Sequence, residues 1–212
     1  SFIIRWQISK KLCSCQRLLE KLRMVENIFC IGNGESRIGY DLDKLKPYGK
    51  IYGCNAMYRD YTPDVLCAVD MGIMHEIYNS GYAQDNSCVF RDWNRMPGDM
   101  YDQLLWAGQQ YSDQDYELIK KENVIKSNER GNCKEFVLHG SNLAGTIEIL
   151  KKNKERVEKK VNHSSINVSW CTDDDKVRAI NDIMQPKDRG WATGPTSGYV
   201  AVADHQPKRV FL

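Results

Sequence analysis

Short apolar runs alternate along this chain with more polar segments. Four such runs lie in the first half, each bounded by glycine, proline, serine or an acidic residue: residues 27–32 (NIFCIG), 50–56 (KIYGCNA), 64–70 (DVLCAVD) and 87–93 (SCVFRDW). Apolar runs this short, without a regular polar alternation, are typical of strands that are buried on both faces. We therefore predict a strand at each run.

The segments between these runs have helical character. Residues 41–49 form a short helical or irregular turn closed by Pro47 and Gly49, and residues 71–81 place apolar side chains on one side before Gly81. Strands that alternate with helices predict an α/β fold. We expect a Rossmann-like domain with a mostly parallel sheet and helices on both faces.

The second half is less regular. Residues 97–134 are polar and tyrosine-rich, which predicts a partly helical cap or insertion near 94–134. Further strands are predicted at 135–140 and 165–170, and helices at 141–161, 172–184 and from about Ser197 to His205. The last apolar run stops at Leu212 in mid-element, so we expect residues 24–212 to form one domain whose sheet is incomplete at the C-terminus.

Charge separates the first 23 residues from the rest. The chain carries a net charge of +2, but residues 1–23 hold six basic side chains and only one acidic one, so the remainder is slightly acidic. This balance argues against nucleic acid as the partner of the main domain. The basic extension is either an amphipathic arm for a membrane or a partner, or, as we favour, an extension that packs as a loose helix or is not part of the native unit.

Cysteine placement and hydropathy indicate the compartment. Cys30, Cys54 and Cys67 lie inside apolar strand-like runs, where a cysteine is a small buried hydrophobe more often than a disulfide partner. No stretch of about 18 uncharged apolar residues occurs, so no transmembrane helix is expected. We predict a cytoplasmic protein; the sequence does not indicate its oligomeric state.

The first strand is followed by a glycine-rich loop with a candidate phosphate site. Gly32, Asn33, Gly34 and Ser36 precede a turn, where glycine allows close approach of a ligand to the backbone and N–H groups can hold an anion. Arg37 stands where the dinucleotide motif has its third glycine. The loop alone is equally compatible with a plain strand-to-helix turn.

Two polar residues follow the next strands. Asn55 ends the second run and Asp70 the third, and the carboxyl ends of parallel strands line the ligand crevice of such sheets. Asn55 offers both a donor and an acceptor to a nucleotide, and Asp70 offers a carboxylate to a sugar hydroxyl. The alternatives are that Asn55 caps a turn and that Asp70 caps the helix beginning at Met71.

Two later segments carry further candidates. His139 ends a predicted strand and is a weak candidate for a catalytic or ligand-contacting group. Thr196, Ser197 and Gly198 form a hydroxyl-rich helix start suited to a phosphate or carboxylate. The acidic run at 173–175 lies in the first turn of a predicted helix, where it is favourable as a capping charge; we predict no metal site.

The order of these motifs resembles a known family. Residues 31–61 (IGNGESRIGYDLDKLKPYGKIYGCNAMYRDY) and 195–212 (PTSGYVAVADHQPKRVFL) are similar to the opening and the later T-S-G helix of the bacterial sialyltransferases of glycosyltransferase family 42. The glycine and asparagine pattern also occurs in related Rossmann-like proteins, including the archaeal pterin-pyrophosphokinase-like family. The chain also looks like uncharacterised proteins of marine tailed phages.

The resemblance implies a nucleotide-sugar site that needs no metal or other cofactor. By position, Gly32, Asn33, Gly34 and Ser36 would surround the donor phosphate and ribose of a CMP-sugar-like substrate, and Asn55 would contact the nucleotide. Thr196, Ser197 and Gly198 would contact the nucleotide or the donor sugar. The implied reaction is direct displacement onto a glycan or small-molecule acceptor.

This chain departs from the family pattern at three points. Glu35 replaces the usual proline beside the phosphate site, and residues 71–190 match the family poorly, which leaves the acceptor open. The family's G-x-D and general-base histidine would follow Leu212. Two alternatives therefore stay open: a catalytically inactive nucleotide- or sugar-binding module, and a pyrophosphokinase-like transferase that uses Mg²⁺.

Overall fold

The fold is known from a computed structural model. It describes residues 25–106, 111–121, 124–140, 151, 166–188 and 190–212. The predicted extension at 1–23 lies outside the described residues, and so does the predicted helix at 141–161 apart from residue 151.

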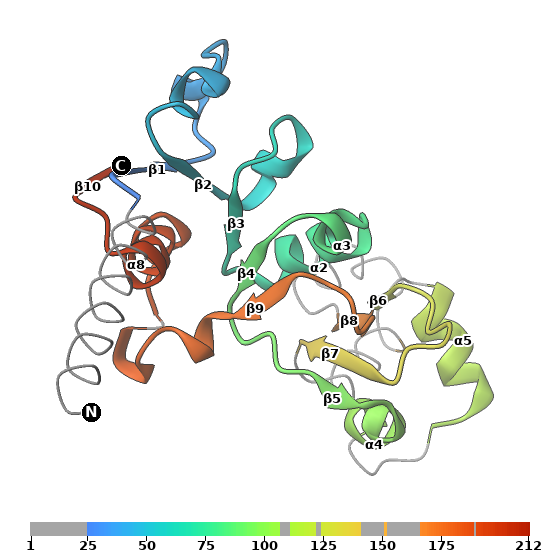
Figure 1. Cartoon of the computed structure of the whole chain (residues 1–212). Helices are drawn as coiled ribbons and strands as arrows, with labels where there is room; N and C mark the ends of the chain where they lie inside the picture. The colour runs from blue at the N-terminus through green and yellow to red at the C-terminus, as the bar shows by residue number, and fades with distance from the viewer. Residues whose placement is uncertain (1–24, 107–110, 122–123, 141–150, 152–165, 189) are drawn as a thin grey trace, which may run out of the picture.

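A six-stranded sheet, parallel throughout, forms the centre of the molecule (Figure 1). Its order is β10-β1-β2-β3-β4-β9. The strands are β1 (Asn27–Ile31), β2 (Lys50–Cys54), β3 (Val65–Ala68), β4 (Cys88–Phe90), β9 (Val177–Ala179) and β10 (Arg209–Phe211). The first four are the four predicted strands, and the predicted α/β, Rossmann-like fold is confirmed.

Helices cover both faces of this sheet, and alternate residues of β3 show how. Leu66 and Ala68 pack with Met74 and Ile77 of helix α2 (Met71–Asn79). Val65, Cys67 and Val69 face the other way and share a core with Val200 and Ala201 of helix α8 (Thr193–His205). Because successive side chains of a strand point to opposite faces, every residue of β3 is buried, as its uninterrupted apolar run predicted.

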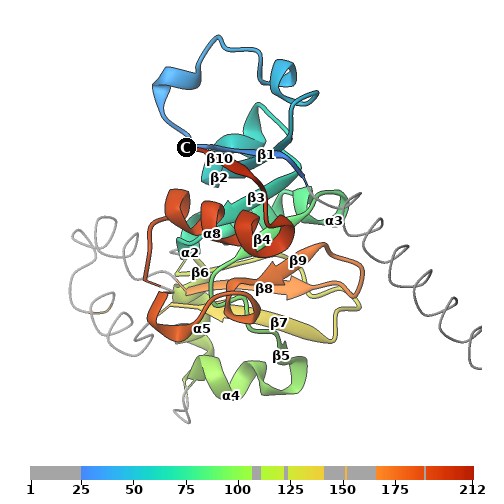
Figure 2. The same cartoon turned by 60° about the vertical axis from the view of Figure 1, so that its left-hand side comes forward.

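The chain between β4 and β9 builds a second sheet of order β5-β7-β8-β6 (Figure 2). These strands are β5 (Met96–Pro97), β6 (Ile125–Ser127), β7 (Glu135–His139) and β8 (Ile166–Cys171). The segment predicted as a cap near 94–134 supplies β5, β6 and the helices α4 (Tyr101–Trp106) and α5 (Asp113–Lys121). The strands predicted at 135–140 and 165–170 pair with each other antiparallel within this second sheet.

Helix α2 packs against both sheets, and the short helix α3 (Tyr82–Asp85) packs against α2. Val137 of β7 and Cys171 of β8 belong to the same apolar core as Met74 and Phe90. The two sheets therefore share one core, in which α2 packs on β8 and on buried residues of β3 and β4.

The helix predicted at 172–184 is absent: these residues form a turn, strand β9 and the 3₁₀ turn η5 (Ile180–Asp182). The reason is tertiary. Val177–Ala179 pair with β4 as the sheet's edge strand, and the Asp175 side chain, fully buried, forms an ion pair with Arg95 rather than capping a helix. Pairing and a buried charge thus outweigh the local helical pattern.

Cys30, Cys54 and Cys67 are buried in the six-stranded sheet with free thiols, as their apolar surroundings predicted. Within the described part of the chain, no helix is long and apolar enough to span a bilayer.

Candidate functional site

A cleft of about 530 Å³ opens at the carboxyl edge of the six-stranded sheet. It is lined by the residues that end or follow β1, β2, β3 and β4, and by the residues that lead into α8: Gly32, Asn33, Cys54, Asn55, Val69, Asp70, Arg91, Gly190, Trp191, Ala192, Thr193 and Gly194. Parallel α/β sheets bind their ligands outside this edge, and the volume falls within the usual range for small-molecule sites.

The first loop reaches the cleft through Gly32 and Asn33 only. Gly34 caps the 3₁₀ turn η1 (Glu35–Arg37), and Ser36 lies exposed within that turn. Neither is among the cleft's lining residues. Glu35, whose charge stands where the resembled family has proline, is also exposed and outside the lining, so its carboxylate does not belong to the wall of the cleft.

The Asn33 side chain is held in one orientation. The Arg37 guanidinium donates two hydrogen bonds to the Asp60 carboxylate (2.9 and 3.0 Å) and a third to Asn33 Oδ1 (2.8 Å). This pairing holds the pKa of Asp60 below its usual range. Because Arg37 occupies the amide oxygen, the amide hydrogens of Asn33 are the part of the side chain left for a ligand.

Asn55 is held in a similar way. It stands at the junction of β2 and η3 (Asn55–Arg59) with φ of 51°, a left-handed conformation that asparagine tolerates better than most residues. Its Oδ1 accepts a hydrogen bond from Thr193 Oγ1 at 3.1 Å. The amide NH₂ is again the group that a bound molecule can use.

Asp70 presents a carboxylate to the cleft. The residue is exposed and precedes α2, but its side chain makes no capping hydrogen bond; its backbone oxygen accepts from Met74 N instead. The predicted alternative of a side-chain cap is therefore not realised. Asp70 is the single carboxylate among the described residues that line the cleft.

The T-S-G segment lies deeper than predicted, because α8 begins at Thr193 and not near Ser197. Thr196 and Ser197 are buried; their hydroxyls donate to the backbone oxygens of Trp191 (3.4 Å) and Gly194 (2.7 Å). A Cβ added at Gly198 would lie in ordinary van der Waals contact with Leu212 and Cys30. None of the three lines the cleft, and Thr193 and Gly194 stand there in their place.

The start of α8 was missed because Gly194 and Pro195 look like loop residues in the sequence. Proline is tolerated in the first turn of a helix, where its missing N–H would have no intrahelical partner. The turn carries no acidic residue, and Ala192 at the N-cap supplies no side-chain hydrogen bond. The N–H groups of Thr193 and Gly194 and the positive end of the helix dipole are thus available at the cleft.

Arg91 and Trp191 are site residues that the sequence analysis did not single out. Arg91 follows β4; its backbone N–H donates to Ala68 O (3.1 Å), and its guanidinium donates to the backbone oxygen of Trp191. Its Nε is buried without a hydrogen-bond partner among the described residues. The rule that singled out Asp70, a polar residue directly after a buried strand, would have found Arg91 as well.

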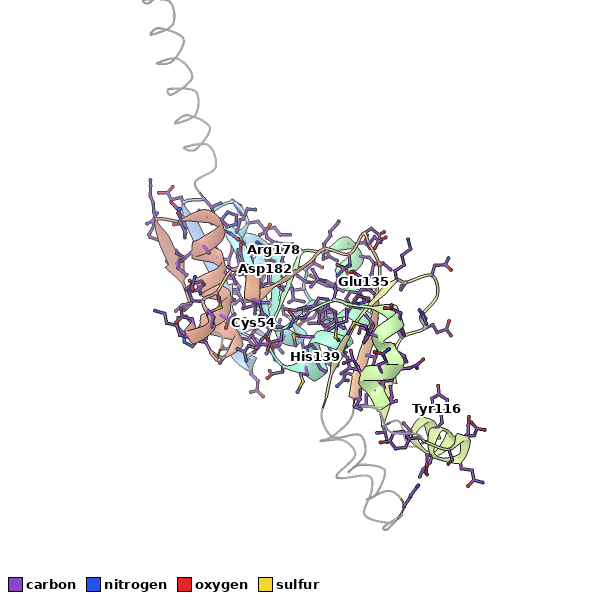
Figure 3. The ribbon with its side chains drawn as sticks, turned by 90° about the horizontal axis from the view of Figure 1, so that it is seen from below. Cys54, Tyr116, Glu135, His139, Arg178 and Asp182 are labelled. Atoms are coloured by element: carbon purple, nitrogen blue, oxygen red, sulfur yellow. The ribbon has the colours of Figure 1, made fainter. Side chains whose placement is uncertain are left out.

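His139 lies elsewhere, at the end of β7 beside α2 (Figure 3). Its Nδ1 is 2.7 Å from His75 Nε2, and its Nε2 is 3.0 Å from Asp92 O. His75 Nδ1 in turn lies 2.7 Å from Ser169 Oγ. Both ring nitrogens of His139 are thus engaged within the protein, and the residue does not line the cleft.

Burial settles the protonation of this histidine pair. It lowers the pKa of His75 to about 3, helped by the neighbouring His139, and it also lowers the pKa of His139. Two neutral rings fix the direction of the chain: His139 Nε2–H donates to Asp92 O, and His75 Nε2–H donates to His139 Nδ1. Ser169 Oγ lies between His75 Nδ1, at 2.7 Å, and Asn79 Oδ1, to which its hydroxyl donates at 2.9 Å.

No cluster of three or more potential metal ligands occurs in the described parts of the chain. Comparisons with protein-family models, with curated proteins and with solved structures found no match. The chemistry of the cleft therefore carries the functional argument.

Proposed function

We propose that this chain is a nucleotide-sugar-dependent, glycosyltransferase-like protein that holds the phosphate of a CMP-sugar-like donor in this cleft. One observation carries the proposal: hydrogen-bond donors from separate elements meet at the carboxyl edge of the sheet. They are the amides of Asn33 and Asn55, the Arg91 guanidinium and the first N–H groups of α8. The order of sequence motifs, similar to family 42 sialyltransferases, supports the same proposal.

These donors suit an anion because their acceptor atoms are already used. Arg37 and Thr193 occupy the side-chain oxygens of Asn33 and Asn55, so both asparagines offer hydrogens. A phosphate that leaves in a displacement reaction gains negative charge, and donors fixed in advance stabilise it. Asp70, the carboxylate of the cleft, is the group that would take the proton of an acceptor hydroxyl.

Affinity measurements test the binding part of the proposal. We expect wild-type protein to bind CMP with a dissociation constant in the millimolar range or tighter, measured by calorimetry. Asn33→Ala and Asn55→Ala should each weaken binding by roughly tenfold or more, because a hydrogen bond to a charged group contributes about 1.5–3 kcal/mol. Unchanged folding, checked by circular dichroism, separates lost binding from lost structure.

Gln114 provides the matched control, since it is an exposed amide side chain on α5 outside the cleft. Gln114→Ala should bind CMP as the wild type does. Absence of CMP, UMP and pyrophosphate binding at millimolar concentration would overturn the proposal, and so would equal effects of all three alanine variants.

A binding module without transferase activity is the second candidate, favoured by the fact that no described histidine lines the cleft. Release of CMP from a CMP-sugar distinguishes the two. Turnover that Asp70→Asn abolishes while CMP binding persists supports the transferase. CMP binding without turnover supports the module, and ATP turnover that requires Mg²⁺ would instead indicate a pyrophosphokinase-like enzyme.

A further inference from the structure

Trp191 is a large aromatic side chain exposed at a polar cleft. The residue is 41% exposed and lies among the lining residues, two positions before the first turn of α8. Most tryptophans in folded proteins are largely buried, so one left half-open in a concave site indicates contact with a bound molecule.

The protein holds Trp191 by its backbone and by one neighbouring ring. Its carbonyl oxygen accepts hydrogen bonds from Arg91 and from Thr196 Oγ1. Its indole meets the Tyr199 ring in an edge-on arrangement, with the centroids 5.8 Å apart. The backbone at Trp191 is therefore held by contacts that do not involve the indole, and the part of the indole that does not meet Tyr199 stays open to the cleft.

We propose that Trp191 is the platform on which the nucleobase of a nucleotide ligand stacks. This inference rests on the proposed phosphate site and deepens it. Arg91 contacts Trp191 directly, and the donor N–H groups of Thr193 and Gly194 follow in the chain, so a flat apolar surface and an anion site adjoin. A nucleotide carries the matching pair, an aromatic base and a phosphate joined by one ribose.

Stacking tolerates every base because each has a π-face. The site would therefore bind purine and pyrimidine nucleotides in preference to free phosphate or a sugar phosphate.

Trp191→Ala isolates the ring, because Arg91 and Thr196 bind the backbone oxygen that the variant keeps. Calorimetry with CMP, AMP, ribose 5-phosphate and pyrophosphate then separates the parts of the ligand. Stacking on an aromatic side chain contributes about 1–3 kcal/mol, so CMP and AMP should each bind roughly tenfold more weakly to the variant. Ribose 5-phosphate and pyrophosphate should bind unchanged, and Trp191→Phe should retain most of the affinity.

Tyr48→Ala is the control, since Tyr48 is an aromatic residue 66% exposed that does not line the cleft. Equal losses for all four ligands in Trp191→Ala would show a structural role and overturn the inference alone. If Trp191→Ala also binds ribose 5-phosphate more weakly, but pyrophosphate unchanged, the sugar and not the base contacts the indole, and the inference is again overturned. Absence of binding of every ligand to the wild type would overturn the proposed phosphate site and the inference together.

Discussion

Replacing Arg95 with methionine should lower the free energy of unfolding by about 3–5 kcal/mol, the usual effect of leaving one member of a buried ion pair without its partner. Arg95 pairs with Asp175, whose side chain is fully buried, and it also donates to Thr172 O at 3.0 Å. Tyr78 O–H donates to the same carboxylate at 2.9 Å, but this neutral contact does not balance the charge. Urea denaturation of both proteins at pH 7.5 measures the difference.

Two further variants separate burial of the charge from loss of the arginine. Arg59→Met breaks an ion pair with Glu76 in which both side chains are largely exposed, so we expect a loss of about 1 kcal/mol or less. Arg95→Met combined with Asp175→Asn removes both charges and should recover part of the stability. If Arg95→Met alone lowers the free energy of unfolding no more than Arg59→Met does, the prediction that the buried ion pair stabilises the fold is wrong.

Stability should also fall as the pH drops below about 6.5. Burial lowers the pKa of His75 to about 3, and it also lowers the pKa of His139. Between about pH 6.5 and pH 3, the unfolded chain therefore binds a proton at His75 that the folded chain excludes. His75 alone then lowers the free energy of unfolding by up to about 1.4 kcal/mol per pH unit, or by about 2 kcal/mol between pH 7.5 and 5.0.

Among the described residues that contact the pair, Ser169, Asn79 and Trp93 are uncharged. Asp92 acts to raise the pKa of His139, but burial outweighs this effect. Urea denaturation between pH 7.5 and 5.0 tests the slope, above the range in which carboxylates titrate.

Removing one histidine at a time assigns the slope. His75→Asn should reduce the change of the free energy of unfolding with pH, whatever the variant's stability at pH 7.5. The pKa of His205 is also lowered by burial, so His205→Gln is the comparison variant. It should reduce the pH dependence of the free energy of unfolding by less than His75→Asn does. A flat stability between pH 7.5 and 5.0 in the wild type would contradict neutral, buried rings.

The six-stranded sheet could be predicted largely because burial leaves a local pattern. The runs that became β1 to β4 are short and apolar on both faces, and each ends at a glycine or polar residue at the cleft edge. Strand β9 could not be predicted in this way. The sequence around Val177 has a helical pattern, and each residue of β9 pairs with a residue of β4 that lies 89 positions earlier in the chain.

The sequence placed some of the candidate residues at the cleft and not others. Gly32, Asn33, Asn55 and Asp70 line one cleft, because the end of a parallel strand fixes the place of the next residue. The T-S-G segment lies outside the lining because α8 begins one turn earlier, at Thr193, and Thr196 and Ser197 are buried. His139 also lies outside the lining, and its contact with His75 of a distant helix is one that no local pattern reveals.

A titration of the ¹⁵N-labelled chain with pyrophosphate, followed by amide NMR, tests the phosphate site most directly. We expect saturable shifts concentrated on Gly32 and Gly194 and on the side-chain amides of Asn33 and Asn55, where the donors of the cleft meet. Absence of shifts at millimolar pyrophosphate, or shifts confined to the basic residues 1–23, would contradict the proposed anion site at the carboxyl edge of the sheet.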